Sequence, residues 1–300
     1  MRVGVIILPQ FPAAETRRRW KSLEDRGFAH GWTYDHLAWR DLADEPWYAT
    51  VPTLVNAAAA TSSLRIGTWV SSPNFREPVT YAKELMTLDD LAGGAPDETG
   101  KGRLIAAIGA GGLGWDAAVL GRPALEPKER VDRLTEFATL SDLLLTQSET
   151  SWRGSYFTAE RARMHPSGSR SRICMVTAGN GPRSVRLAAG FDGWATTGPE
   201  GDLSTDQWWE RVAFLAGTYS EAVRKTDRDP ARLRRFLSLD LAPGFTLSDS
   251  RSFTAAARRA RALGFTDVII HWPRPSGVYA GDETVLDQIA GLLVDGQLPD

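Results

Sequence analysis

Short apolar runs alternate with longer amphipathic segments along the whole chain, and the alternation begins at residue 2. Each apolar run has the length and composition of a strand. Each segment that follows repeats its apolar residues at the three- and four-residue spacing of a helix. The pattern predicts eight strand–helix units, with strands at residues 2–8, 32–34, 64–70, 104–108, 173–178, 193–198, 236–242 and 267–272.

The segments after these strands also carry helix-start signals. Pro78 and Pro127 fall in the first turn of two of them, where the amide hydrogen that proline lacks is not needed for the helix. The expected helices cover residues 16–26, 46–61, 78–91, 127–145, 183–190, 205–225, 250–263 and 282–293.

The strand runs are almost continuously apolar, which is typical of a parallel sheet that is buried on both faces. Eight units within 300 residues suit a (β/α)8 TIM barrel, and no change of composition divides the chain. We therefore expect an α/β fold of this class, with residues 1–300 forming a single domain. An open, doubly wound sheet is the alternative.

One segment departs from the alternation. Residues 148–172 are polar and lack helical periodicity, and they include WRGSYF, which predicts a small hairpin around Gly154. We expect a short insertion here, after the fourth helix.

Composition narrows the function classes. Hydrophobic residues make up 42% and charged residues 24% of the chain, and the formal net charge is -2. Without a basic stripe, nucleic acid is not an expected partner. No run reaches membrane-spanning length and the first residues lack a signal-peptide pattern, so we expect a cytoplasmic protein without membrane contact. The single cysteine, Cys174, rules out an internal disulfide and suits a reducing compartment.

The fourth strand leads into a glycine-rich loop, LIAAIGAGGLG, which contains Gly109-x-Gly111-x-x-Gly114. This spacing matches the Rossmann dinucleotide fingerprint, but that fingerprint belongs in the first βαβ unit and precedes an acidic residue at the end of the next strand. Here three strand–helix units come first. In a barrel, the same loop lies at the C-terminal face, where glycines let the backbone approach a ligand. A flexible surface loop is the alternative.

Polar residues follow other strands as well. Asp35 and His36 come after the second strand, and a histidine beside a carboxylate can act as an acid or base near neutral pH. A helix-capping Asp with an exposed His is the alternative. Ser72 belongs to a polar group after the third strand, which could equally be turn chemistry. Residues 179–181 follow the fifth strand and precede a helix, as in phosphate-binding loops, or form an ordinary turn.

Aromatic residues recur at strand ends. Trp39, Trp115 and Trp272 each come just after an expected strand, which suggests an aromatic-walled cavity and a largely apolar or planar substrate. His271 either faces this cavity or is a core histidine. The four histidines show no metal-ligand spacing, so we expect no metal.

Taken in order, these strand ends resemble the bacterial luciferase-like monooxygenase superfamily, and within it the coenzyme F420-dependent oxidoreductases. GFAHGWTYDHLAW resembles the family's second strand with its Asp-His pair. LRIGTWVSSPNFREPVTYAKELMTLDDLAGG resembles its third strand and the helix that follows. IGAGGLGWD is similar to its glycine loop, and TAGNGPRSVRLAAGFDGWAT to its phosphate loop and next strand.

The resemblance implies a barrel that holds a flavin or deazaflavin at its C-terminal mouth. His36, Asp35 and Trp39 become the catalytic candidates, with Asp35 also touching the ring or its linker. A cis peptide bond between Trp69 and Val70 is implied behind the ring. The other implied cofactor contacts are Ser72, Gly109, Ala110, Gly111, Gly179, Asn180 and Gly181, the last three at the phosphate, and the implied substrate pocket comprises Trp39, Trp115, His271 and Trp272.

Two departures from the family pattern stand out. Tyr34 precedes the Asp-His pair where the family has serine, and the connection at residues 93–102 is longer than usual. The insertion after the fourth helix is short, so we expect any lid over the site to be small.

The resulting hypothesis is an F420-dependent oxidoreductase that transfers hydride between the deazaflavin and a small organic substrate. An FMN-dependent two-component monooxygenase in the same barrel is the first alternative. A non-catalytic flavin-binding protein and a Rossmann dehydrogenase are two others. As partners, the hypothesis implies a second copy of the chain in a homodimer and a flavin or F420 reductase.

Overall fold

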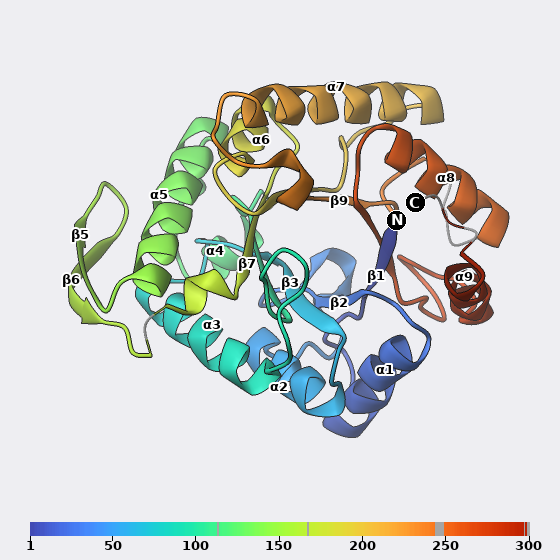
Figure 1. The fold of residues 1–300 in the computed structure, drawn as a ribbon, viewed down its shortest axis with the longest axis horizontal. Coiled ribbons are helices and arrows are strands. Elements are labelled where there is room, and N and C mark those ends of the chain that lie inside the picture. Colours follow the sequence, from blue (N-terminus) through green and yellow to red (C-terminus); the bar gives the residue numbers. More distant parts are fainter. Residues whose placement is uncertain (113, 167, 244–248, 297, 299–300) are drawn as a thin grey trace.

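The structure is a computed structural model in which residues 1–112, 114–166, 168–243, 249–296 and 298 are described. The described residues contain a closed barrel of eight parallel strands in the order β1-β10-β9-β8-β7-β4-β3-β2. Figure 1 shows the helices surrounding it. The predicted (β/α)8 barrel is confirmed. The open-sheet alternative is wrong, because β1 pairs with both β2 and β10 and so closes the sheet.

The strands occupy the segments that the apolar runs predict. Their bounds are Arg2–Ile6 (β1), His30–Thr33 (β2), Arg65–Ser71 (β3), Leu104–Ile108 (β4), Cys174–Ala178 (β7), Gly193–Thr196 (β8), Arg234–Ser238 (β9) and Asp267–His271 (β10).

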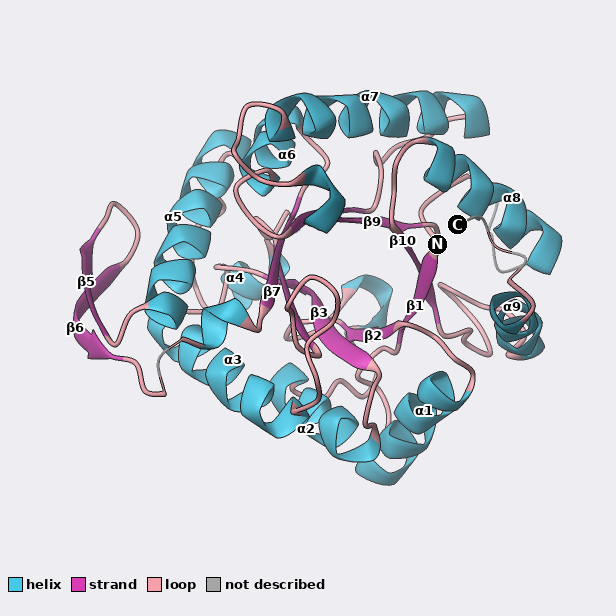
Figure 2. Cartoon of the chain, in the orientation of Figure 1, coloured by secondary structure: helices cyan, strands magenta, loops and turns pink. Residues whose placement is uncertain are grey.

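The long helices also match their expected positions, and Figure 2 shows them as an outer ring around the strands. None of the helices in the part of the chain that the structure describes combines the length and the apolar character needed to cross a membrane. The bounds are Ala13–Asp25 (α1), Thr50–Ala60 (α2), Pro78–Ala92 (α3), Pro127–Thr146 (α5), Pro182–Ala188 (α6), Thr205–Val223 (α7), Ser250–Ala262 (α8) and Thr284–Val294 (α9).

The second helix begins later than its sequence pattern suggests, at Thr50 instead of Pro46. The residues before it are held by other parts of the barrel mouth. The Trp47 indole N–H donates to the backbone oxygen of His36 at 2.8 Å, and the Tyr48 amide donates to the Pro9 oxygen at 2.6 Å. These bonds tie the segment to the loops around the cavity instead of to a helix.

The predicted hairpin is present in the insertion. Strands β5 (Glu149–Arg153) and β6 (Thr158–Arg163) pair antiparallel and lie outside the helix ring (Figure 1). Gly154 lies in their turn, where a Cβ would stand 1.8 Å from Oε1 of Glu136. The Glu136 carboxylate accepts backbone N–H bonds from residues 155–157, which anchor the turn on α5.

A short helix, α4 (Trp115–Val119), follows the glycine loop and is not anticipated by the periodicity. Five residues are too few to establish a helical repeat in the sequence. The periodicity likewise does not predict the short 3-10 turns of the described chain, which are η1 (Arg40–Leu42), η2 (Ser169–Ser171) and η3 (Pro230–Arg232).

The apolar residues form two separate layers, because successive side chains of a strand point to opposite sides of the sheet. On β10, Ile269 belongs to the cluster inside the barrel, whereas Val268 and Ile270 pack outward against the helices. Trp32, Trp69 and other large side chains fill the interior.

A buried charged network closes the N-terminal end of the barrel. Asp267 accepts from Arg234 at 2.6 Å and lies 3.0 Å from Nε2 of His30, whose Nδ1 accepts from the Trp32 indole at 2.6 Å. Burial raises the pKa of the Asp267 carboxyl, but Arg234 and His30 outweigh it and hold that pKa well below its ordinary value. Burial lowers the pKa of His30 to about 4. The opposite end of the barrel is left for a ligand cavity.

Candidate active site at the barrel mouth

A cavity of about 520 Å³ opens where the barrel strands end. Its wall is assembled from segments far apart in the chain, as the C-terminal face of a barrel requires. The predicted site residues in the wall are His36, Trp39, Trp69, Val70, Ser72, Gly109, Ala110, Gly111, Gly179, Asn180, Gly181 and His271.

The end of β3 shapes the glycine loop. The peptide bond between Trp69 and Val70 is cis, as the resemblance implies. A Cβ on Gly109 would lie 2.6 Å from Cγ2 of Val70, so only glycine fits behind this bond. Gly111 has φ +70°, and a Cβ there would lie 2.2 Å from Nδ2 of Asn74. The loop is therefore held against β3 and exposes its backbone to the cavity.

Two loops of this wall present backbone amides without partners in the described chain. The N–H groups of Ala110, Gly111, Asn180 and Gly181 donate to no other group among the described residues. Arg130 also lines the cavity, and no carboxylate in the described part of the chain pairs with it. Free amides and an unpaired guanidinium fit a ligand that carries an anionic group and ring carbonyls.

His36 is held by a carboxylate that the sequence analysis missed. Its Nδ1 lies 2.6 Å from Oδ2 of Asp116, and Oδ1 of Asp116 accepts from the Leu37 amide at 2.7 Å. The carboxylate keeps a proton on Nδ1, so in the neutral ring Nε2 carries the lone pair, and Nε2 has no partner among the described residues. The Trp39 ring lies 4.7 Å from the His36 ring. This arrangement suits a histidine that exchanges a proton at Nε2.

A second polar array reaches the cavity from the ends of β2, β9 and β10. His271 lies 2.8 Å from the Tyr34 hydroxyl and 2.5 Å from Oδ2 of Asp240, and the Tyr279 hydroxyl is 3.0 Å from that of Tyr34. Burial, followed by Tyr279, raises the pKa of Tyr34 well above its ordinary value, so its hydroxyl keeps its proton. His271 thus faces the cavity and is not simply a core residue.

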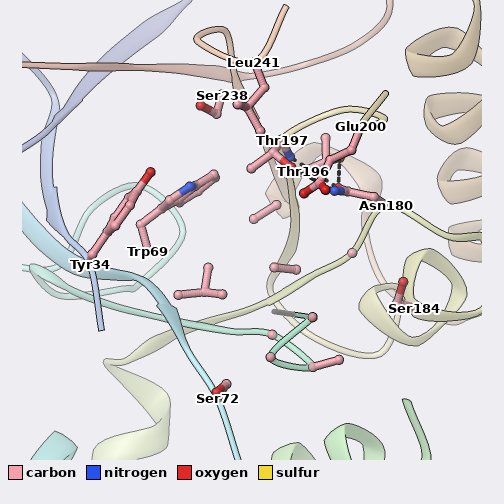
Figure 3. A pocket seen from close by; sticks show the side chains of 18 of the residues that line it. Tyr34, Trp69, Ser72, Asn180, Ser184, Thr196, Thr197, Glu200, Ser238 and Leu241 are labelled. Atoms are coloured by element: carbon pink, nitrogen blue, oxygen red, sulfur yellow. Dashed lines mark hydrogen bonds between the residues drawn. The ribbon is translucent and has the colours of Figure 1, made fainter. Parts of the chain in front are cut away.

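Asn180 lines the cavity, and its side chain also stabilises the loop to which it belongs. Its Oδ1 accepts from Oγ1 of Thr196 at 2.7 Å, and its Nδ2 donates to Oγ1 of Thr197 at 2.8 Å (Figure 3). A Cβ on Gly179 would lie 2.1 Å from Oγ of Ser184. These contacts hold the loop so that its free amides face the cavity, while the Asn180 side chain itself is engaged by threonines.

Asp35 does not lie where the resemblance puts it. It is absent from the cavity wall, and its buried carboxylate accepts from Arg76 at 2.6 Å and 3.1 Å. Arg76 in turn donates to Glu84 at 3.0 Å. The backbone directs Tyr34 and His36 to the cavity and the residue between them to the outside. The structure therefore contradicts the assignment of Asp35 to the ring.

Two of the three strand-end tryptophans are also outside the site. Trp115 lies on α4, is 42% exposed and does not line the cavity. Trp272 faces outward from β10, where its indole donates to Glu283 at 2.8 Å and Arg19 lies over its ring. Because His271 points inward, the next residue must point outward.

The residues that sequence reasoning missed lack a local signal. Asp116 comes from the short helix α4, whereas Asp240 and Tyr279 come from loops. Each is joined to a predicted or neighbouring site residue, namely His36, His271 or Tyr34. Tyr34 carried a usable signal, because it replaces a serine next to the predicted Asp-His pair.

The fold and cavity define a (β/α)8-barrel protein with a ligand site at its C-terminal mouth. The family model for the luciferase-like monooxygenases matches residues 1–266, and the chain therefore belongs to that family.

Similar proteins refine the comparison. The chain is 27% identical over 289 residues to an F420-dependent hydroxymycolic acid dehydrogenase of Mycobacterium tuberculosis, covering 94% of this chain and 72% of the relative. It is 30% identical over 238 residues to an F420-dependent glucose-6-phosphate dehydrogenase of Intrasporangium calvum, covering 76% and 66%. An F420-dependent secondary alcohol dehydrogenase, solved with an F420-acetone adduct, shares the fold with a TM-score of 0.78 at 16% identity, covering 97% of both chains.

Proposed function

We propose that this protein is an F420-dependent oxidoreductase that transfers hydride between the deazaflavin and a small organic substrate. The observation that carries the proposal is His36, which Asp116 holds so that Nε2 is free in the same cavity as the unpaired loop amides. The F420-dependent relatives support the choice of cofactor.

The chain's own residues fit such a cofactor. The free amides at residues 110–111 and 180–181 and the guanidinium of Arg130 would hold its ring carbonyls and phosphate. Trp69 and Val70 would support the ring from the barrel side. When bound, the deazaflavin supplies the hydride chemistry, and the protein supplies orientation and proton exchange.

In this reaction, His36 hydrogen-bonds the reacting part of the substrate through Nε2 and holds or moves a proton there. Trp39 restricts the substrate beside it, and the aromatic wall excludes water. Replacing His36 with alanine should reduce turnover by roughly 10²–10⁴-fold if it is the general acid or base. Unchanged turnover in His36→Ala would remove it from that role.

The test of the cofactor is a binding comparison. We expect F420 to raise the melting temperature of the purified protein with the logarithm of its concentration above its Kd, and FMN to do so far less. Arg130→Gln should weaken F420 binding by about 10-fold, the scale of one charge-assisted hydrogen bond. Arg183→Gln is the matched control, because Arg183 pairs with Asp132 and does not line the cavity.

An FMN-dependent monooxygenase is the second candidate, because the description of the matching family model names a monooxygenase. Preferential protection by FMN would favour it. Binding of either cofactor without turnover of any hydride donor or acceptor would favour a non-catalytic binding protein.

A further inference from the structure

Three side chains from separate strand ends meet on the side of the cavity away from the glycine loop. Tyr34 follows β2, Asp240 follows β9, and His271 ends β10. Oδ2 of Asp240 accepts from the backbone N–H of His271 at 2.6 Å and lies 2.5 Å from its Nδ1. Nε2 of His271 lies 2.8 Å from the Tyr34 hydroxyl.

The chemistry of these groups fixes the direction of each hydrogen bond. A carboxylate only accepts, so Nδ1 of His271 carries a proton, and in the neutral imidazole Nε2 then presents a lone pair. The Tyr34 hydroxyl must then donate to Nε2. The Tyr279 hydroxyl, 3.0 Å away, donates to the Tyr34 oxygen. A phenol oxygen has two lone pairs, so that of Tyr34 can accept one further hydrogen bond.

The array borders the cavity. Tyr34, His271 and Tyr279 all line it, whereas Asp240 lies fully buried behind them. Figure 3 shows the Tyr34 side chain directed into this space with Trp69. Tyr279 has φ +61°, and its ring stacks on His271 at 3.6 Å between centroids and 8° between planes. A tyrosine held in the left-handed region indicates a backbone constrained by its surroundings at a functional site.

We propose that Tyr34 binds the oxygen of an alcohol or carbonyl substrate and exchanges its proton with His271, which Asp240 positions. The inference rests on the proposed function and adds to it the substrate class and a second proton-exchanging group.

The array and His36 flank the same part of the cavity. The Tyr34 ring lies 4.8 Å from the Trp39 ring and 6.0 Å from the His36 ring, measured between centroids. An oxygen on the reacting carbon therefore meets two polar groups. Tyr34 takes the proton of the substrate hydroxyl, so the lone pair on Nε2 of His36 is left to accept from another donor group near the reacting carbon.

The step balances in the direction of alcohol oxidation. The substrate C–H bond breaks, and its electron pair leaves with the hydrogen as hydride to the oxidised deazaflavin. The substrate O–H proton moves to the Tyr34 oxygen while the Tyr34 proton moves to Nε2 of His271, and a C=O bond forms. The resulting imidazolium is stabilised by Asp240. Ketone reduction is the reverse, with protonated His271 resupplying Tyr34.

The test is single-turnover hydride transfer with F420 and a panel of 2-propanol, cyclohexanol and 1-phenylethanol, after F420 affinity has been measured for each variant. We expect Tyr34→Phe to slow hydride transfer by about 10- to 100-fold and to leave F420 affinity within two-fold of wild type. Tyr219→Phe is the matched control, because Tyr219 has a buried hydroxyl without a partner in the described chain and lies outside the cavity.

The possible results distinguish failure of this inference from failure of the proposed function. A Tyr34→Phe rate equal to that of Tyr219→Phe would overturn the inference and leave the proposed function intact. So would a wild-type enzyme that binds F420 but oxidises no member of the panel. Failure of the wild type to bind F420 would instead contradict the proposed function.

Asp240→Asn tests the positioning role through a signature that does not depend on turnover. In wild type, the Nδ1 proton of His271 should give a strongly downfield proton NMR signal, which Asp240→Asn should remove and Tyr34→Phe should shift. The same variant should slow hydride transfer about 10-fold without changing the KM for the alcohol. A downfield signal that persists in Asp240→Asn would contradict the arrangement.

Discussion

Neighbouring side chains at one strand end face opposite sides of the barrel wall, and this alternation separates catalytic candidates from structural residues. Tyr34 and His36 line the cavity, whereas Asp35 between them pairs with Arg76. His271 faces the cavity, whereas Trp272 packs under Arg19.

The two tryptophans Trp39 and Trp272 give a matched pair of substitutions. Trp39→Phe should reduce turnover by about 10-fold or more, since it loosens the geometry beside His36. Trp272→Phe should leave turnover unchanged and lower the free energy of unfolding by about 1 kcal/mol, since it removes the bond to Glu283. Steady-state kinetics and chemical denaturation of both variants make the comparison. Equal losses of turnover would place Trp272 in the site after all.

Asp116 sets which nitrogen of His36 carries the proton. Asp116→Asn can donate as well as accept, so it no longer enforces a proton on Nδ1. We expect turnover to fall by roughly 10²-fold while F420 affinity stays within two-fold. Asp44→Asn, at an exposed position of the loop between β2 and α2, is the control. A normal rate in Asp116→Asn would show that the tautomer of His36 has no part in the reaction.

At the scale of elements, the alternation of apolar runs and helical periodicity predicts the barrel because each unit is long enough to show its period. The periodic pattern does not extend into the loops and the short helix that supply several of the site residues. The helix α4 is too short to show a period, yet it supplies Asp116, and the loops after β9 and β10 supply Asp240 and Tyr279. The direction of a loop side chain depends on contacts with residues that are distant in sequence. The Asp35 carboxylate, for example, points toward Arg76 and away from the cavity.

The glycine loop offers a test at this scale. Gly111→Ala places a Cβ 2.2 Å from Nδ2 of Asn74 at a φ of +70°. The loop must shift, so we expect F420 affinity to fall by at least about 10-fold and stability to fall by about 1–3 kcal/mol. A Cβ on Gly112 meets nothing within 4 Å, so Gly112→Ala should bind F420 normally. Isothermal titration and thermal unfolding measure both effects, and equal affinities in the two variants would exclude this role for the loop.

At the scale of the whole molecule, the two ends of the barrel have different roles. The His30–Asp267–Arg234 network closes the N-terminal end with charges that are fully paired. The C-terminal end carries unpaired amides and two histidines held by carboxylates. Stability and chemistry are thus separated along the barrel axis.

The closed end predicts a pH dependence of stability. The pKa of His30 is about 4 in the folded protein and about 6.5 in the unfolded chain. Between these two pH values the unfolded state therefore binds more protons than the folded state. The free energy of unfolding falls by about 3 kcal/mol as the pH falls from about 6.5 to about 4. Asp267 adds to the loss only below its own unfolded pKa of about 3.9.

Denaturant titrations across this range should show the slope, and His30→Asn should flatten it. His165→Asn, at an exposed position, should keep it. A slope that survives in His30→Asn would mean that another group takes up the proton.

A crystal structure with F420 tests the central claim most directly. The account predicts the ring in the mouth cavity against Trp69, Val70 and the loop at residues 109–111, with its phosphate near residues 179–181 and Arg130. The ring should leave room for a small substrate between His36 and Tyr34. F420 bound anywhere else on the barrel, or a cavity that accepts FMN and excludes F420, would contradict it.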